Sequence, residues 1–147
     1  MKPIQSNCLA GVRYFTLFAL AVVILSSCAR KVVFQSSPVV PAATGTVKMK
    51  RDNNNNYALT IRVRNLADPE QLNPPKKYYI VWMESEYNGV KNLGQLRSST
   101  GFLSKKLKAE LNAVTPYRPR SIFITAEFET EIQYPGPDVV LRSNTFR

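Results

Sequence analysis

Alternation of apolar and polar residues is the feature that most constrains the fold of this chain. The alternation runs through residues 46–51 and again through 57–64, and the two runs flank a polar segment from Asp52 to Asn56. Side chains of a strand point to its two faces in turn, so each run predicts a strand with one buried and one wet face. Two such runs joined by residues that favour turns predict a β-hairpin.

Further strands are predicted at residues 78–87, 90–97, 121–132 and 139–141. Asn88-Gly89 between the first two is a strong signal for a hairpin turn. Residues 78–82 are apolar at every position, which suits a central strand, and Trp82, the only tryptophan, is expected in the core. About seven strands with turn signals between them predict an all-β, immunoglobulin-like β-sandwich.

The segment 102–114 carries two conflicting patterns. Leu103, Leu107 and Leu111 repeat at helical spacing, whereas the apolar residues from Leu107 to Ala113 alternate as in a strand. Its lysine, leucine, alanine and glutamate favour a helix, and its strand-rich surroundings favour β-structure. A strand is the preferred prediction, and a helix stays open.

The first 27 residues have the composition of an export signal. Lys2 and Arg13 precede an apolar run at 14–25 that holds no charge, and Ser26 and Ser27 follow it. A basic segment, a short apolar run and small residues characterise a secretory signal peptide. The run is shorter than the roughly 20 residues that a membrane-spanning helix needs. Residues 1–27 are therefore predicted to be cleaved.

The end of this signal, Leu25-Ser26-Ser27-Cys28, resembles the lipobox of bacterial lipoproteins. The resemblance implies that Cys28 receives a diacylglycerol, that cleavage occurs before it, and that its amine is often acylated too. Ala29, Arg30 and Lys31 follow, without an acidic residue, and this implies the periplasmic face of the outer membrane. The alternative is a plain signal peptide that ends near Ala29, with Cys28 an incidental residue.

Removal of the signal leaves 120 residues, enough for one domain with a core. Residues 28–44 have little periodicity and two prolines, and they are interpreted as the lipidated cysteine and a flexible tether. An edge strand at Val32-Val33-Phe34 is the open alternative. Residues 45–147 are interpreted as the β-sandwich domain.

The chain is basic, with 20 lysines and arginines against 10 acidic residues. The signal holds two of the basic residues, so the mature chain carries a net charge of +8. This balance suits lipopolysaccharide, phospholipid head groups or acidic polysaccharide, although a solvated surface would also explain it. No nucleic-acid motif is present, and no nucleic-acid partner is expected. The candidate anion-binding residues are Arg62, Arg64, Lys105, Lys106 and Lys108.

The chain has few residues for catalysis. It contains no histidine, and its two cysteines, Cys8 and Cys28, both belong to the export segment. No thiol nucleophile, disulfide, metal site or cofactor is therefore predicted for the domain. Two acidic clusters remain, and their i, i+2 spacing places each on one strand face: Glu84 with Glu86, and Glu127 with Glu129 and Glu131.

Paired carboxylates can hydrolyse glycosides or hold calcium. The same spacing occurs on any polar strand face, where carboxylates face water or pair with Arg62, Arg64 and lysines across the sheet. The second interpretation is preferred, so the chain is predicted not to be an enzyme. A carboxylate-based hydrolase is the remote alternative.

Three motifs resemble the extracytoplasmic domain of anti-sigma-K factors. They are Tyr79-Ile80-Val81-Trp82, Leu93-Gly94-Gln95-Leu96, and Ile124-Thr125-Ala126-Glu127 with the following Pro135-Gly136-Pro137 and Val139-Val140-Leu141. The resemblance implies a β-sandwich with a sensory or protein-binding role. That family also has a cytoplasmic helical domain and a transmembrane helix, which this sequence does not match, so inhibition of a sigma factor is not carried over.

The sequence thus predicts a lipid-anchored periplasmic protein with a non-enzymatic binding or envelope-structural role. Its expected partners are the membrane, through the lipid on Cys28, and an envelope protein. The alternative function is binding of an anionic envelope polymer or lipopolysaccharide through the basic side chains.

Overall fold

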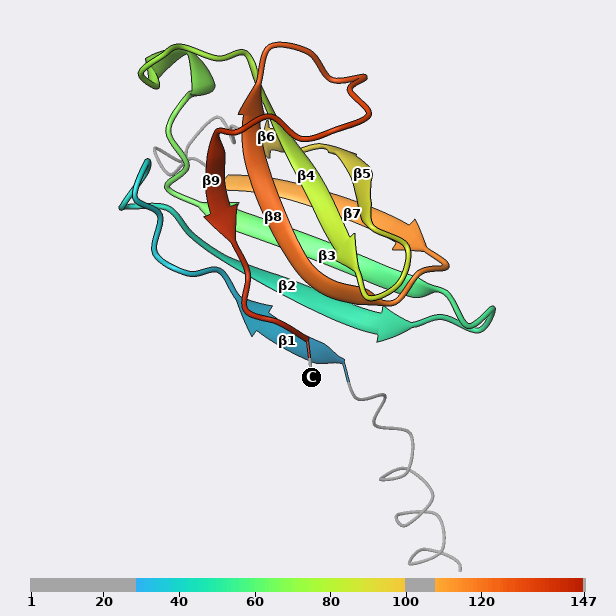
Figure 1. Cartoon of the computed structure of the whole chain (residues 1–147). Helices are drawn as coiled ribbons and strands as arrows, with labels where there is room; N and C mark the ends of the chain where they lie inside the picture. Colours follow the sequence, from blue (N-terminus) through green and yellow to red (C-terminus); the bar gives the residue numbers. More distant parts are fainter. Residues whose placement is uncertain (1–28, 100–107, 147) are drawn as a thin grey trace, which may run out of the picture.

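The computed structural model describes residues 29–99 and 108–146, which form two antiparallel sheets packed face to face (Figure 1). The strands are β1 (Arg30–Val33), β2 (Thr44–Arg51), β3 (Tyr57–Arg64), β4 (Tyr78–Ser85), β5 (Val90–Gln95), β6 (Arg97–Ser99), β7 (Lys108–Thr115), β8 (Pro119–Glu127) and β9 (Val139–Arg142). One turn of 3-10 helix, η1 (Pro69–Gln71), lies between β3 and β4. Within these residues no helix is long and apolar enough to span a membrane.

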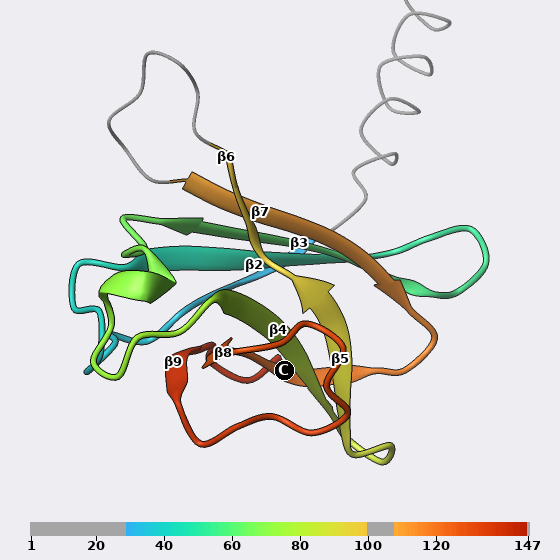
Figure 2. The same cartoon turned by 90° about the horizontal axis from the view of Figure 1, so that it is seen from above.

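The strand order confirms the predicted immunoglobulin-like β-sandwich. One sheet has the order β1-β2-β3-β7-β6 and the other the order β5-β4-β8-β9. Without β1, these are the A-B-E-D and C′-C-F-G orders of immunoglobulin-like sandwiches. The two layers are seen edge-on in Figure 2. The described residues form nine strands, more than the predicted number of about seven.

One extra strand arises because the run predicted at 90–97 is split at Leu96. β5 pairs with β4 in one sheet, and β6 pairs with β7 in the other. Gly94 has a φ of 117°, in the region that favours glycine, next to a register shift opposite Val81 and Trp82. Leu96 is buried at the crossing, and its N–H donates to the Tyr79 carbonyl at 2.9 Å. The alternation of a single run does not reveal this change of sheet.

The other extra strand corrects the prediction of a tether at 28–44. β1 pairs with β2 from Arg30 to Val33, and Phe34 is buried with its N–H bonded to the Gly45 carbonyl at 3.0 Å. Val40 and Ala43 are also buried in the core. The open alternative of an edge strand is therefore the one found, and the domain begins at β1 rather than at residue 45. Residues 1–28, with the predicted signal and Cys28, lie outside the described residues.

The ambiguous segment is a strand where it is described. β7 pairs with β3 over its whole length, from Lys108 opposite Arg64 to Thr115 opposite Tyr57. The predicted strand is thus confirmed for 108–114, and residues 102–107 lie outside the described part of the chain. Pairing with β3 prevails over the helical preference of the individual residues, because it buries Ala109 and half-buries Leu111 against the core.

The hairpin predictions are confirmed. β2 and β3 pair from Thr44–Arg64 to Arg51–Tyr57 across the polar turn, whose Asp52 carboxylate accepts the N–H groups of Asn54 and Asn56 at 2.8 Å. Gly89 has a φ of 67° in the turn between β4 and β5, and its carbonyl accepts the Ser85 N–H. Both turns use residues that adopt tight conformations at little cost.

The main core lies between the sheets, and β4 and β8 are buried on both faces. Tyr79, Val81 and Met83 contribute to the main core, while Ile80 and Trp82 point to the opposite side of the sheet. Strand β8 ends at Glu127, before the predicted end at 132. The following loop, 128–138, lies on the outer side of the four-stranded sheet, as Figure 2 shows.

Candidate anion-binding face

The outer face of the four-stranded sheet is apolar and covered. Ile80, Trp82 and Phe123 form a second buried cluster there, and Ile132 of the loop and Val139 of β9 pack against it. The Trp82 and Phe123 rings stack with centroids 6.4 Å apart. The indole N–H of Trp82 donates to the Thr125 hydroxyl at 2.8 Å, which satisfies the only polar group of that side chain. Trp82 is therefore in a core, as predicted, but under a loop rather than between the sheets.

Two polar contacts fix the loop that covers this face. The Asn92 side-chain amide donates to the Ile132 carbonyl at 3.0 Å. The Glu127 carboxylate, which is buried, accepts the Gly136 N–H at 2.8 Å. A Cβ at Gly136 would lie 2.7 Å from a Glu127 carboxylate oxygen, so this contact requires glycine. Glu127 thus holds the two ends of the loop together.

The outer face of the five-stranded sheet is basic and open. On β1, β2, β3 and β7 the residues that point away from the core include six cations and one acid, Glu110. All six cations are exposed: Lys31, Lys48, Lys50, Arg62, Arg64 and Lys108. We refer to these seven residues as the basic face. Neighbouring strands are about 4.8 Å apart and alternate residues along a strand about 6.5–7 Å apart, so the charges lie close together.

Like charges lie directly opposite one another at two places on the basic face. Lys31 on β1 is opposite Lys48 on β2, and Arg64 on β3 is opposite Lys108 on β7. Directly opposed like charges destabilise a sheet, by up to about 1 kcal/mol for each pair. A bound anion would remove this repulsion.

Arg62 and Glu110 form an ion pair on this face. The Arg62 Nε donates to Glu110 Oε2 at 2.8 Å, and a second guanidinium nitrogen lies 3.3 Å from Oε1. The hydrogen bond from Arg62 lowers the pKa of Glu110, and the hydrogen bond from Glu110 raises the pKa of Arg62. Both side chains are about half exposed, so the pair contributes little to stability. It holds Arg62 in a fixed orientation at the centre of the face.

The structure brings together three of the five predicted anion-binding residues. Arg62, Arg64 and Lys108 share the basic face, and Lys105 and Lys106 lie outside the described residues. Lys31, Lys48 and Lys50 were not among the predicted residues. The alternation of β2 with Val47 and Met49 already indicated that Lys48 and Lys50 share a wet face, but the pairing of β1, β2 and β3 was needed to join that face to Arg62.

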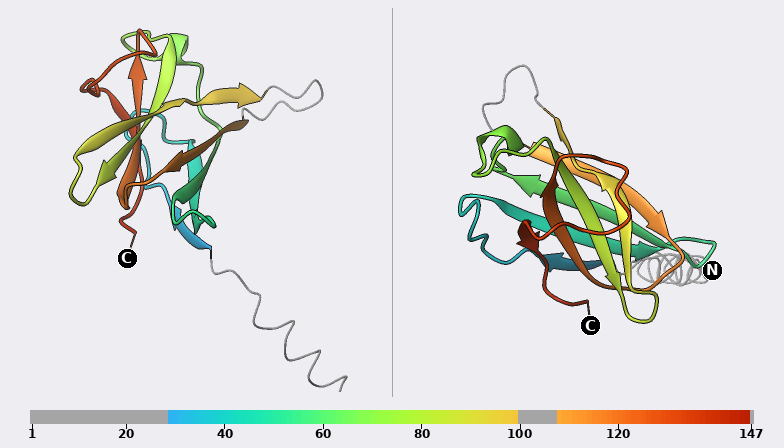
Figure 3. Two further views of the ribbon diagram at one scale, coloured as in Figure 1. Left: turned by 90° about the vertical axis from the view of Figure 1, so that its right-hand side faces the viewer. Right: turned by 45° about the horizontal axis from the view of Figure 1, so that its top comes forward.

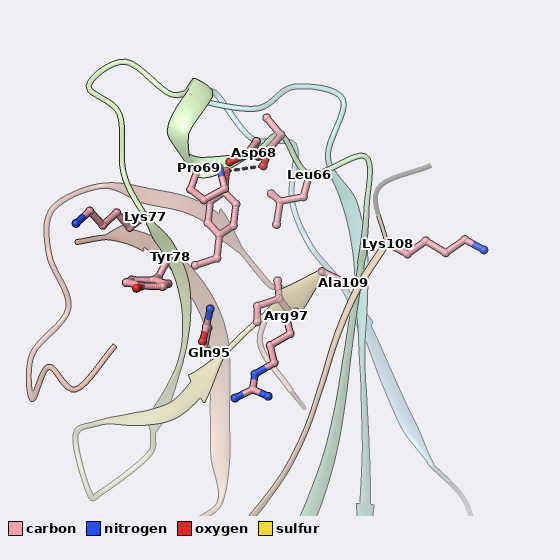
Figure 4. Close-up of a pocket in the computed structure, with 12 residues that line it drawn as sticks. Leu66, Asp68, Pro69, Lys77, Tyr78, Gln95, Arg97, Lys108 and Ala109 are labelled. Carbon is pink, nitrogen blue, oxygen red and sulfur yellow. Dashed lines mark hydrogen bonds between the residues drawn. The ribbon is translucent and has the colours of Figure 1, made fainter. Parts of the chain in front are cut away.

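A cavity of about 420 Å³ opens at the end of the sandwich where β3 leads into η1 (Figure 4). Leu66, Pro69 and Tyr79 form part of its wall, and Lys77 and Lys108 point away from it on opposite sides. The Tyr79 hydroxyl donates to the Ala67 carbonyl at 3.0 Å, and burial raises the pKa of this tyrosine to about 12. Because Lys77 and Lys108 point away from it, these two cations do not converge on the cavity.

The predicted acidic clusters are not formed as expected. Strand β4 ends at Ser85, after a register shift, and β8 ends at Glu127, so Glu86, Glu129 and Glu131 lie beyond the strand ends. Glu84 accepts the Ser121 hydroxyl at 2.8 Å and lies 3.4 Å from Arg142, while Glu86 lies 3.5 Å from Arg118. The expected partners Arg62, Arg64 and the lysines are thus replaced by Arg142 and Arg118.

No group of three or more carboxylates that could hold a metal ion occurs in the ranges 29–99 and 108–146.

Comparisons with known proteins add no relative. No family model matches the chain, and neither a curated protein nor a solved structure matches it. The resemblance of the domain to anti-sigma-K factors stays a prediction. The geometry of the basic face is therefore the main structural indication of function.

Proposed function

We propose that this chain is a lipid-anchored protein of the periplasmic side of the outer membrane, with a non-enzymatic binding role. Its ligand is an anionic envelope polymer, such as the phosphorylated sugars of lipopolysaccharide. The observation that carries this proposal is the basic face, where six exposed cations on four adjacent strands are accompanied by a single carboxylate. The lipobox-like Leu25-Ser26-Ser27-Cys28 supports the anchor.

The layout of the cations favours a polymer with repeated charge. The basic face spans the width of four strands, and the backbone positions of neighbouring cations along and across the strands are about 5–7 Å apart. A polymer with closely spaced anionic groups can contact several of them at once, and simultaneous contacts add affinity. Guanidinium groups such as those of Arg62 and Arg64 also bind phosphate and carboxylate with two parallel hydrogen bonds.

The same face is poor in the residues that anchor protein partners. Interfaces between proteins concentrate their binding energy in buried aromatic and apolar residues at the centre. Among the described residues, the large exposed apolar side chains on the same side of the sheet are Val33 on β1 and Val114 on β7, which lie on different strands separated by β2 and β3. This separation supports a polyanion over a protein partner.

The anchor is tested by the substitution Cys28→Ser in the full chain. Loss of the acylated thiol should release the protein from isolated membranes, because the remaining contacts are electrostatic and weaken with salt. Immunoblots of membrane and supernatant fractions after a high-salt wash measure this release. A serine variant that stays in the washed membranes would contradict the lipid anchor.

The ligand is tested by titrating the full chain, purified in detergent, with delipidated lipopolysaccharide at increasing salt. Binding should weaken steeply with ionic strength, and Arg62→Gln/Arg64→Gln should lower the affinity about tenfold. Lys77→Gln/Arg120→Gln is the matched control, since it removes two exposed cations that lie outside the basic face. Equal losses in the two variants, or binding that is insensitive to salt, would refute the proposed ligand. Circular dichroism of both variants verifies that they are folded.

A further inference from the structure

A second group of cations lies at the end of the sandwich where β1 begins. Arg30, Arg51 and Arg118 line a pocket of about 340 Å³ together with Met49 and Tyr57. No carboxylate is among the residues that line it. Three guanidinium groups around one small space form an arrangement suited to phosphate, which accepts paired hydrogen bonds from arginine.

Strand pairing brings these residues together from distant parts of the chain. Arg30, the first residue of β1, lies opposite Met49, and Arg51, the last residue of β2, lies opposite Tyr57. Arg118 immediately precedes β8, at the same end. Figures 1 and 3 show the start of β1, the β2–β3 turn and the β4–β5 turn at one end of the molecule. The pocket is therefore a feature of the end of the sandwich, separate from the basic face.

Neighbouring side chains hold Arg51 and Arg118 in place. A guanidinium nitrogen of Arg51 donates to the Tyr57 hydroxyl at 2.9 Å, and the guanidinium carbon lies 5.1 Å from the centre of the tyrosine ring. Arg118 lies 3.5 Å from the Glu86 carboxylate. Contacts of this kind lower the entropy that a ligand must remove when it orders a side chain.

The pocket lies close to the predicted anchor along the chain. Only Ala29 separates Cys28 from Arg30, and two residues of extended chain span about 7 Å at most. Because β1 is paired with β2 from Arg30 onward, the sequence leaves no long tether between a lipid on Cys28 and the sandwich. A lipid on Cys28 would therefore hold this end of the domain at the head groups.

Exposed tyrosines accompany the arginines at this end. Tyr87, in the β4–β5 turn next to Glu86, is 87 % exposed, and Tyr117, next to Arg118, is 38 % exposed. The Lys91 ammonium lies 5.6 Å from the centre of the Tyr117 ring. Tyrosine is favoured at the membrane–water interface, where its ring is partly buried and its hydroxyl stays wet. Basic and aromatic side chains thus occur together where a membrane would be met.

We infer that the Arg30–Arg51–Arg118 pocket binds the phosphate of an anionic phospholipid in the membrane that carries the anchor. The inference rests on the proposed lipid at Cys28, and it is independent of the proposed polymer. Docking through this end leaves the basic face directed sideways, because the faces of a sheet run parallel to its strands. The anchored protein can then hold its membrane with one surface and a polymer with the other.

The test uses the full acylated chain reconstituted in vesicles, with a fluorophore on the single new thiol of Asn88→Cys. Asn88 is exposed in the β4–β5 turn and does not line the pocket. Quenching by a nitroxide-labelled head group reports how close this end comes to the membrane. We expect several-fold stronger quenching in vesicles of phosphatidylcholine with phosphatidylglycerol than in phosphatidylcholine alone. Equal quenching in the two kinds of vesicle would overturn the inference.

Three variants assign the effect to the pocket. Arg51→Gln/Arg118→Gln should reduce quenching to the level seen in phosphatidylcholine, and Arg62→Gln/Arg64→Gln on the basic face should leave it unchanged. Arg51→Lys/Arg118→Lys keeps both charges without the paired donors, and it should restore only a small part of the quenching. Full restoration by lysine, or an equal loss in the Arg62 and Arg64 variant, would show that the lipid attracts the positive charge of the protein in general. Either result would overturn the proposed phosphate site.

Flotation of the same vesicles separates this inference from the proposed function. Protein that floats with the vesicles in high salt but shows no lipid-dependent quenching overturns the docking alone. Protein that leaves the vesicles in high salt overturns the lipid anchor, and the docking with it. Loss of binding to delipidated lipopolysaccharide leaves the docking result untouched, because that binding depends on the other surface.

Discussion

The outer faces of the two sheets differ as much as two surfaces of one small domain can. The four-stranded sheet turns Ile80, Trp82 and Phe123 outward and covers them with the loop 128–138. The five-stranded sheet turns out the basic face, which no loop among the described residues covers. A sandwich needs only its inner faces for the main core, so its outer faces can serve different purposes. Here one face adds stability, and the other is available for binding.

The difference begins in the central strands. β4 and β8 have apolar residues on both faces, so exposure of either face to water would be costly, and a covering loop is required. β2 and β3 alternate, and their outer faces carry lysine, arginine and threonine, which water can solvate. The same inner packing therefore accommodates a second core on one side and a charged surface on the other.

The largest effect that would test this comparison is that of Trp82→Ala. Loss of a fully buried tryptophan leaves a cavity under the loop and should lower the free energy of unfolding by about 3–5 kcal/mol. Arg64→Gln, on the basic face, should change it by no more than about 0.5 kcal/mol. Denaturation with urea measures both. Similar losses in the two variants would contradict the division between a stabilising and a binding face.

A smaller effect is expected when the covering loop is released. Glu127→Ala leaves the Gly136 N–H without its partner, and it should cost about 1–3 kcal/mol. The amide hydrogen of Gly136 should exchange faster, and the fluorescence of Trp82 should respond more strongly to solvent. Glu129→Ala, which removes an exposed carboxylate of the same loop, is the control and should change neither. Unchanged exchange at Gly136 in the Glu127 variant would show that the contact does not hold the loop.

The smallest effect on stability, but a measurable one on binding, is expected for Glu110→Gln. It removes the one acid of the basic face, so the affinity for delipidated lipopolysaccharide should rise several-fold while stability changes by less than about 1 kcal/mol. Lowering the pH should also raise the affinity. Because Arg62 lowers the pKa of Glu110 from its ordinary value of 4.5, the ion pair is complete above that pH and is lost as the pH falls through the lower folded value.

Binding titrations at neutral and acidic pH check this expectation. The parent chain should gain affinity only below about pH 4.5, and the Glu110→Gln variant should not show that particular gain. A variant that binds more weakly than the parent would mean that the Arg62–Glu110 pair positions the arginine for the ligand, rather than competing with it.

The sequence predicted much of the fold because most of its strands are local and strongly patterned. The β2–β3 and β4–β5 hairpins followed from alternation and from the turn residues at Asp52–Asn56 and Asn88-Gly89. β1 was interpreted as a tether, since four residues are too few to show a clear period. Its strand structure is evident only from its pairing with β2. The split at Leu96 was missed because a change of sheet does not interrupt the apolar pattern.

The candidate site was predicted in part for the same reason. Arg62 and Arg64 are on one strand, so their shared face followed from spacing alone. Lys108 joins them through the pairing of β7 with β3, Lys48 through the pairing of β2 with β3, and Lys31 through the pairing of β1 with β2. The arginine pocket combines arginines from three separate segments, and no local pattern links them.

The sequence by itself determined most of the strands, their buried and wet sides, and the tight turns, because these depend on neighbours along the chain. Only the tertiary structure decided which strands lie side by side, that Trp82 is buried beneath a loop, and that six cations meet on one face. The physical reason is that a period of two separates the two sides of a strand without specifying its partner. Pairing depends on burial over the whole domain, and that burial unites residues far apart in the chain.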